Sequence, residues 1–158
     1  MSSIFTASDV LEFAVRMEEN GGLFYREAAD RSAQGEAKKL FTSLALEEAE
    51  HKKTFEEFLS KVTLNDTPEG YPGEFLAYLH NYIDGKIFFT PESKSDLSSN
   101  SDIATALEFA IQREMDAIHY YQELKAFVSV YDHPTLDKII AEERKHFVQL
   151  TDVKKNLK

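Results

Sequence analysis

Four segments of this chain carry apolar residues at alternating steps of three and four, and an acid or an imidazole interrupts each stripe. That spacing places the residues of a stripe on one face of an α-helix. In the second segment the interruption is Glu48 and His51, where a helix packed into a core would ordinarily hold Leu or Ile. A buried charge costs free energy unless something compensates for it. A metal ion is the obvious compensator, so the pattern predicts a metal site inside a helical bundle.

The other three stripes repeat this design. Glu143 and His146 have the same Glu-x-x-His spacing, which lets both side chains leave one helix face and reach the same ion. The first and third stripes each contain a single acid. A lone Glu-x-x-His is common and usually solvated, so the prediction depends on the conjunction of all four stripes. The candidate metal ligands are Glu18, Glu48, His51, Glu114, Glu143 and His146.

The chain is an internal repeat, because the ligands of the first half recur in the same order in the second. We expect one all-α domain over residues 1–158, built as a four-helix bundle. Its helices should span about 7–31, 36–61, 102–130 and 134–155. They form two pairs, 7–61 and 102–156, joined by a long crossover, 62–101, that contains a short helix at 74–83.

Two local signals refine the first helix. Thr6 and Asp9 have the spacing of a capping box, so the helix should begin near residue 7. Gly21 and Gly22 are unfavourable inside a helix. They either allow another helix to approach closely or mark a small distortion.

Composition narrows the possible functions. The net charge of −10 disfavours nucleic acid as a partner. The chain has no cysteine, which excludes disulfides, zinc–thiolate sites and iron–sulfur centres. No apolar run is long enough for a membrane span, and the N-terminus has no signal-peptide pattern, so we expect a cytoplasmic protein.

Carboxylate and imidazole ligands suit iron or manganese, and the lack of thiolates argues against copper(I). Zinc is also compatible with these ligand types. Four carboxylates would balance two divalent ions, with Glu48 and His51 on one ion and Glu143 and His146 on the other. Two of the four acids must then span both ions, and the sequence leaves open which two.

Several polar residues near the ligands have simpler interpretations. Tyr25 and Tyr121, each seven residues after a lone acid, are either core aromatics with satisfied hydroxyls or donors to a ligating carboxylate that shape access for a small oxidant. Two further sets lie off the stripes. The neighbouring acids, expected in solvent, are Glu19, Glu47, Glu50 and Glu142. The histidines expected at the surface or in hydrogen bonds are His80, His119 and His133.

The motifs Leu-Glu-Glu-Ala-Glu-His at 46–51 and Ala-Glu-Glu-Arg-Lys-His at 141–146, with Met-Glu-Glu at 17–19, resemble those of the rubrerythrin family of ferritin-like di-iron proteins. The resemblance covers essentially the whole chain and implies a di-iron centre that reacts with hydrogen peroxide or oxygen, often in a homodimer. It implies the same six ligands. Two features depart from the family: no cysteines are present for a rubredoxin-like domain, and Ala117 stands where rubrerythrins carry an extra Glu. The second departure implies a more symmetric six-ligand set.

Three functions remain open. In the first, two Fe(II) ions reduce hydrogen peroxide or oxygen, and an external donor such as a rubredoxin-like protein restores them. In the second, the same site oxidises ferrous iron that then moves on. The third is a metal-free helical interaction module.

Overall fold

Local sequence signals set the ends of the helices in the computed structural model, which describes residues 6–62, 74, 77–79, 81 and 100–157. Thr6 and Asp9 form the expected capping box at the start of α1, with Asp9 N–H donating to Thr6 Oγ1 over 3.2 Å. Pro134 lies in the first turn of α5, where its missing N–H is not needed. The helices are α1 (Ala7–Arg31), α2 (Glu36–Lys61), α4 (Asn100–Leu124) and α5 (His133–Asn156), with a short 3-10 helix η1 (Val130–Asp132) before α5.

The third predicted helix is shorter than expected, because α4 ends at Leu124 and not near residue 130. After Leu124 the backbone hydrogen bonds tighten, with Phe127 N–H donating to Leu124 O over 2.9 Å. This turn buries the Phe127 side chain in the core. Most of the predicted crossover, 62–101, lies outside the described residues, so the short helix at 74–83 stays a prediction.

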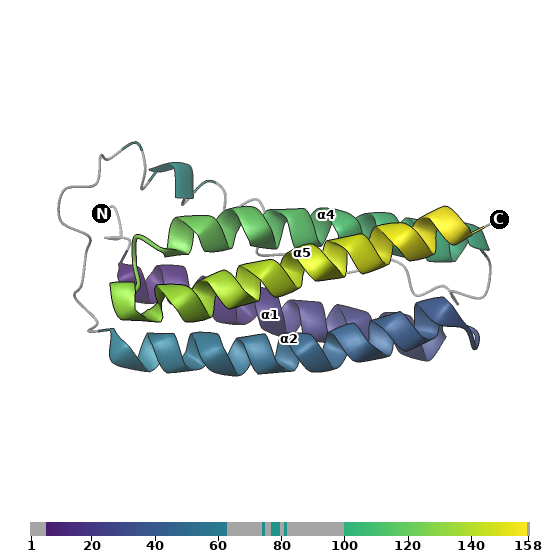
Figure 1. Ribbon diagram of the computed structural model, residues 1–158, viewed down its shortest axis with the longest axis horizontal. Helices are drawn as coiled ribbons and strands as arrows, with labels where there is room; N and C mark the ends of the chain where they lie inside the picture. The colour runs from purple at the N-terminus through teal and green to yellow at the C-terminus, as the bar shows by residue number, and fades with distance from the viewer. Residues whose placement is uncertain (1–5, 63–73, 75–76, 80, 82–99, 158) are drawn as a thin grey trace.

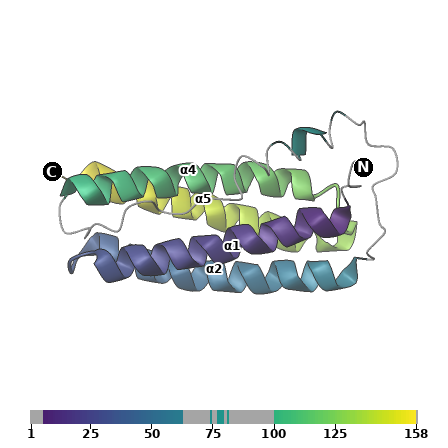
Figure 2. The same ribbon diagram turned by 180° about the vertical axis from the view of Figure 1, so that it is seen from behind.

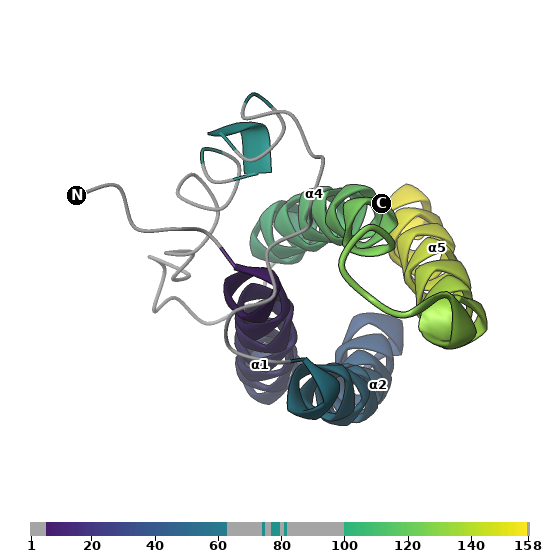
Figure 3. The same ribbon diagram turned by 90° about the vertical axis from the view of Figure 1, so that its left-hand side faces the viewer.

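The four long helices form a ferritin-like bundle of two antiparallel pairs (Figures 1 and 2). Seen end-on, α1 lies beside α2 and α4 beside α5 (Figure 3). Packing within each pair is far more extensive than packing between α2 and α5 or between α1 and α4. The two pairs therefore act as units that meet along the centre of the molecule.

The apolar core is divided into two clusters, one towards each end of the bundle. One is centred on residues such as Leu11, Phe55 and Leu136, and the other on residues such as Phe41 and Leu107. A fully buried Leu or Phe stabilises a fold by about 1.5–3 kcal/mol. The middle of the bundle lacks such residues, and the polar side chains of the stripes lie there. No described helix is both long enough and apolar enough to span a membrane.

Candidate metal centre

The six predicted ligands meet in the middle of the bundle. One acid comes from α1 and one from α4, and α2 and α5 each supply a Glu and a His one helical turn apart. None of the six residues is more than 4% exposed. Two groups of ligand atoms form, each with all atoms within 4.8 Å of one another. The groups are Glu18, Glu48, His51 and Glu143, and Glu48, Glu114, Glu143 and His146.

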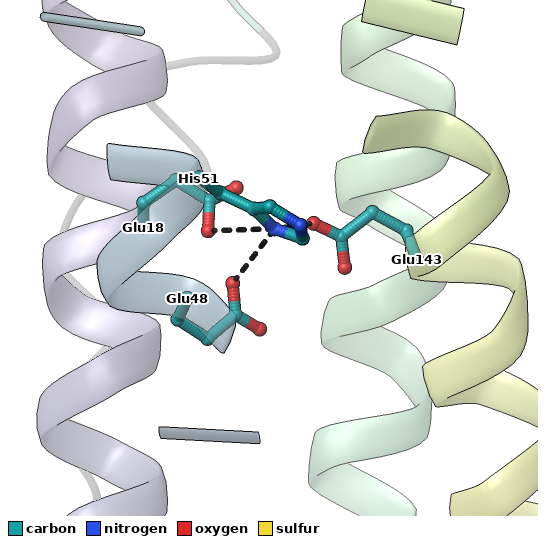
Figure 4. A group of neighbouring side chains, drawn as sticks. All are labelled: Glu18, Glu48, His51 and Glu143. Carbon is teal, nitrogen blue, oxygen red and sulfur yellow. Dashed lines mark ion pairs between the residues drawn. The ribbon is translucent and has the colours of Figure 1, made fainter. Parts of the chain in front are cut away.

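The first group is arranged around His51 Nδ1 (Figure 4). This nitrogen lies 2.9 Å from Glu143 Oε1 and 3.6 Å from Glu18 Oε2. Glu48 Oε2 lies 3.7 Å away. Three helices thus direct ligand atoms at one point, as the sequence pattern predicted.

The second group is arranged in the same way around His146 Nδ1. Glu143 Oε2 lies 3.1 Å from this nitrogen, and Glu114 Oε2 lies 3.8 Å from it. Glu48 Oε1 is 3.9 Å away. Because Glu48 and Glu143 belong to both groups, they are the two acids placed to span a pair of ions, which the sequence left open.

Unpartnered atoms test whether these residues fit metal ions. Among the described residues, six buried side-chain polar atoms have no hydrogen-bond partner, and five of them belong to this cluster. Each acid keeps one such oxygen, and such orphaned groups are costly in a core. Oxygen and imidazole donors in this number suit iron or manganese, so the residues present fit a pair of divalent ions. The five atoms are Glu18 Oε2, Glu48 Oε2, His51 Nδ1, Glu114 Oε2 and Glu143 Oε1.

The electrostatics of the cluster also favour bound positive charge. Burial, followed by repulsion from Glu48 and Glu143, raises the pKa of Glu18 well above its usual value, and Glu114 behaves similarly. Burial acts to lower the pKa of His146, but its hydrogen bonds to Glu114 and Glu143 outweigh this and raise the pKa to about 11. The cluster therefore draws cations from solution, whether protons or metal ions.

The two tyrosines donate hydrogen bonds to the lone acids, crosswise between the helix pairs. Tyr121 Oη donates to Glu18 Oε1, and Tyr25 Oη donates to Glu114 Oε1. Burial raises the pKa of both phenols well above the ordinary value, so they stay protonated as donors. The second of the two sequence interpretations therefore holds for their contacts. That they shape access for an oxidant stays a prediction.

Two of the acids expected in solvent have a different role, and that prediction was wrong for them. Glu142 Oε2 lies 2.8 Å from His51 Nε2, and Glu47 Oε2 lies 2.9 Å from His146 Nε2. A carboxylate only accepts hydrogen bonds, so each Nε2 carries a proton, and Nδ1 is the ring nitrogen that faces the cluster. The helical-wheel position of these acids is off the stripe, and only the helix opposite brings a histidine within reach.

The remaining polar predictions are confirmed where they can be tested. The side chains of Glu19 and Glu50 are exposed. His133 Nε2 lies 2.8 Å from Lys125 O, and His119 contacts Tyr78. His80 lies outside the described residues.

Arg113, which no sequence pattern singled out, places its guanidinium in contact with Glu48. The signal was the glycine pair in α1. A Cβ on Gly21 would collide with the Arg113 guanidinium, whereas a Cβ on Gly22 would meet only ordinary contacts. The close approach at Gly21 is therefore made by a side chain of α4 and not by a helix backbone.

Comparison with known proteins agrees with this geometry. Residues 9–154 match the Rubrerythrin family. Among curated proteins, none matches the sequence. Among solved structures, the chain is similar to a protein from Thermotoga maritima that is provisionally described as a ferritin-like diiron-carboxylate protein. The two are 27% identical over 96% of each chain, with a TM-score of 0.66.

Proposed function

The chain belongs to the rubrerythrin family, and from that premise we propose that it is a di-iron protein that reduces hydrogen peroxide or oxygen. The observation that carries the proposal is the set of buried, unpartnered carboxylate oxygens, one on each of four acids, that face one another between two oriented histidines. Two bound Fe(II) ions would supply the two electrons that, with two protons, convert hydrogen peroxide to water, and an external donor would return those electrons.

The protein's own residues have three tasks in this proposal. Glu48 and Glu143 would each contact both ions, since each belongs to both ligand groups. Glu142 and Glu47 hold the histidine rings so that Nδ1 faces the ions. The apolar clusters on either side of the ligands would limit the access of bulk water to the site.

An anaerobic titration with Fe(II) tests the proposal first, and we expect two ions per chain. Exposure of the loaded protein to peroxide, and separately to oxygen, should then give a ferric spectrum. Repeated turnover with peroxide in the presence of a reductant would support the peroxidase function. Glu48→Ala and His146→Ala should each lose bound iron, and unchanged iron content in both variants would contradict the proposal.

A second candidate is iron handling, and a recess between α2 and α5 favours it. This recess has a volume of about 460 Å³, and its lining includes three acids, Glu47, Glu50 and Glu142, beside the predicted ligand His51, together with Lys138. Net loading of iron beyond two ions per chain would support this function over peroxide reduction. Iron or manganese binding without either activity would leave a structural role.

The partners implied by the family belong to the same proposal. We expect a homodimer in solution, which gel filtration with light scattering checks. We also expect a rubredoxin-like protein to reduce the oxidised centre, which stopped-flow spectroscopy measures directly.

A further inference from the structure

Arg113 breaks the two-fold arrangement of the candidate centre. The other members occur in pairs that the internal repeat relates: the lone acids, the Glu-x-x-His couples, the tyrosines and the acids that orient the histidines. The repeat aligns Arg113 with Met17, and Gly21 with Ala117. One half of the centre therefore has a guanidinium with a glycine beneath it, and the other half has an uncharged side chain and an alanine.

Contacts on several sides hold Arg113 in place. Its Nη1 lies 3.4 Å from Glu48 Oε1 and 4.0 Å from Glu114 Oε1. Its Nη2 donates to the backbone oxygen of Met17, and the guanidinium lies 5.8 Å from the centre of the Tyr25 ring. The side chain is only 12% exposed. The positive charge is therefore fixed beside the cluster and poorly screened by solvent.

The positive charge of Arg113 contacts one ligand group more than the other. Both carboxylates that Arg113 contacts, Glu48 and Glu114, belong to the group that contains His146. Of these two carboxylates, the group that contains His51 includes only Glu48. Arg113 stays charged at any pH at which the protein folds. A cation bound in the His146 group is therefore repelled more strongly than one bound in the His51 group.

We propose, on the basis of the function proposed above, that Arg113 makes the two metal positions unequal, so that the His146 position binds its ion more weakly and fills second. Arg113 is in this respect a positioning residue, because it acts through Glu48 and Glu114 and is not itself a candidate ligand. Its charge opposes a cation in the His146 position, and its contact with Glu48 Oε1 competes with that cation for the same oxygen.

Calorimetric titration with Mn²⁺ under anaerobic conditions, in which the ion stays divalent, measures the two binding constants. The wild-type protein should show two resolved steps. Arg113→Met, which copies the residue at the related position in the first half, should tighten the second step about tenfold and leave the first nearly unchanged. Glu114→Gln should remove the weaker step, and Glu18→Gln should remove the tighter one.

A second variant tests the same effect while Arg113 stays in the chain. Gly21→Ala should displace the Arg113 guanidinium from its position beside Glu48, and should therefore also tighten the second Mn²⁺-binding step. Two matched controls should leave both steps unchanged. They are Gly22→Ala, whose new Cβ meets only ordinary contacts, and Arg26→Met, which removes a cation that donates to Gly22 O on the same helix.

The outcomes separate this inference from the proposed function. The role of Arg113 would be overturned if the wild type bound both ions equally tightly. It would also be overturned if Arg113→Met and Gly21→Ala both left the ratio of the two binding constants unchanged. Either result would still leave a two-ion centre. The absence of any Mn²⁺ and Fe²⁺ binding to the wild type would instead overturn the proposed function, and this inference with it.

Discussion

Each acid of the cluster has one oxygen engaged by the protein and one without a partner. Tyr121 and Tyr25 engage the lone acids, Arg113 engages Glu48, and His146 Nδ1 lies 3.1 Å from Glu143 Oε2. The engaged oxygens fix the carboxylate planes before any ion arrives. Such preorganisation of ligands by their hydrogen-bond partners commonly changes metal affinity by 10- to 100-fold in proteins.

Tyr121→Phe should therefore weaken metal binding by about tenfold, because Glu18 Oε1 loses its donor and the carboxylate gains freedom to rotate. Calorimetric titration with Mn²⁺ measures the change. The adjacent Tyr120 is a matched control, since its hydroxyl donates to the backbone oxygen of Val10 over 2.7 Å and contacts no ligand. Equal losses of affinity in Tyr121→Phe and Tyr120→Phe would indicate a general packing defect and not an oriented ligand.

Glu142→Gln should also weaken metal binding by about tenfold, because an amide no longer favours the tautomer in which His51 directs a Nδ1 lone pair at the ions. Glu50→Gln removes a charge of the same sign from the same recess. Because Glu50 contacts Lys53 and not a histidine, the metal affinity of this variant should stay at the wild-type value. If both substitutions had the same effect, the recess would act by general electrostatics.

The convergence of the six candidate ligands could be predicted from sequence because these residues interrupt helical stripes, and a stripe indicates which side of a helix is buried. Glu47 and Glu142 could not, since their partners lie on another helix and no pattern within one helix encodes that contact. Arg113 left only an indirect trace, the unfavourable Gly21 in α1.

At the level of elements, the ends of α1 and α2 follow capping and turn residues, whereas the early end of α4 depends on burying Phe127 in the assembled core.

The three glycines around α1 and α2 have different structural roles. Gly21 makes room for the Arg113 guanidinium. Gly22 lies in the helix with only ordinary contacts around its Cβ position. Gly35 precedes α2 with φ of 149°, in a region that other residues rarely adopt, and has open space around it. Substituting Gly22 and Gly35 by alanine can therefore separate the effect of steric room from the effect of backbone conformation on stability.

Gly22→Ala should raise the free energy of unfolding by about 0.5–1 kcal/mol, since alanine favours the helix and fits the site. Gly35→Ala should lower it by about 1–2 kcal/mol, because the new side chain forces a strained backbone. Urea unfolding monitored by circular dichroism measures both. A destabilising Gly22→Ala would mean that the contacts near Ala45 and Glu48 are tighter than described.

At the level of the whole molecule, the closest approach of helices is within each pair, and the candidate ligand cluster lies where the two pairs meet. Each ligand group takes residues from both pairs. The first takes Glu143 from the second pair, and the second takes Glu48 from the first pair. Bound ions would therefore add to the apolar contacts that already join the two pairs.

Saturating divalent metal should raise the free energy of unfolding by about 2.7 kcal/mol when its concentration is 100 times the dissociation constant. Scanning calorimetry in EDTA and in excess Mn²⁺ measures the shift. Glu143→Ala should lose most of it, because this residue belongs to both groups, whereas Glu50→Ala should keep it. A melting temperature that does not respond to metal in the wild type would contradict ion binding to the folded state.

The crosswise hydrogen bonds between Glu47 and His146, and between Glu142 and His51, have a consequence for biogenesis. The first helix pair, α1 and α2, leaves the ribosome before the second. At that stage the ring of His51 is not yet oriented, because its partner Glu142 belongs to α5, which has not been made. Under the function proposed above, the full set of candidate ligands is thus assembled only when the two hairpins dock. A half-finished chain would then be spared from binding iron before the apolar core has closed around the site.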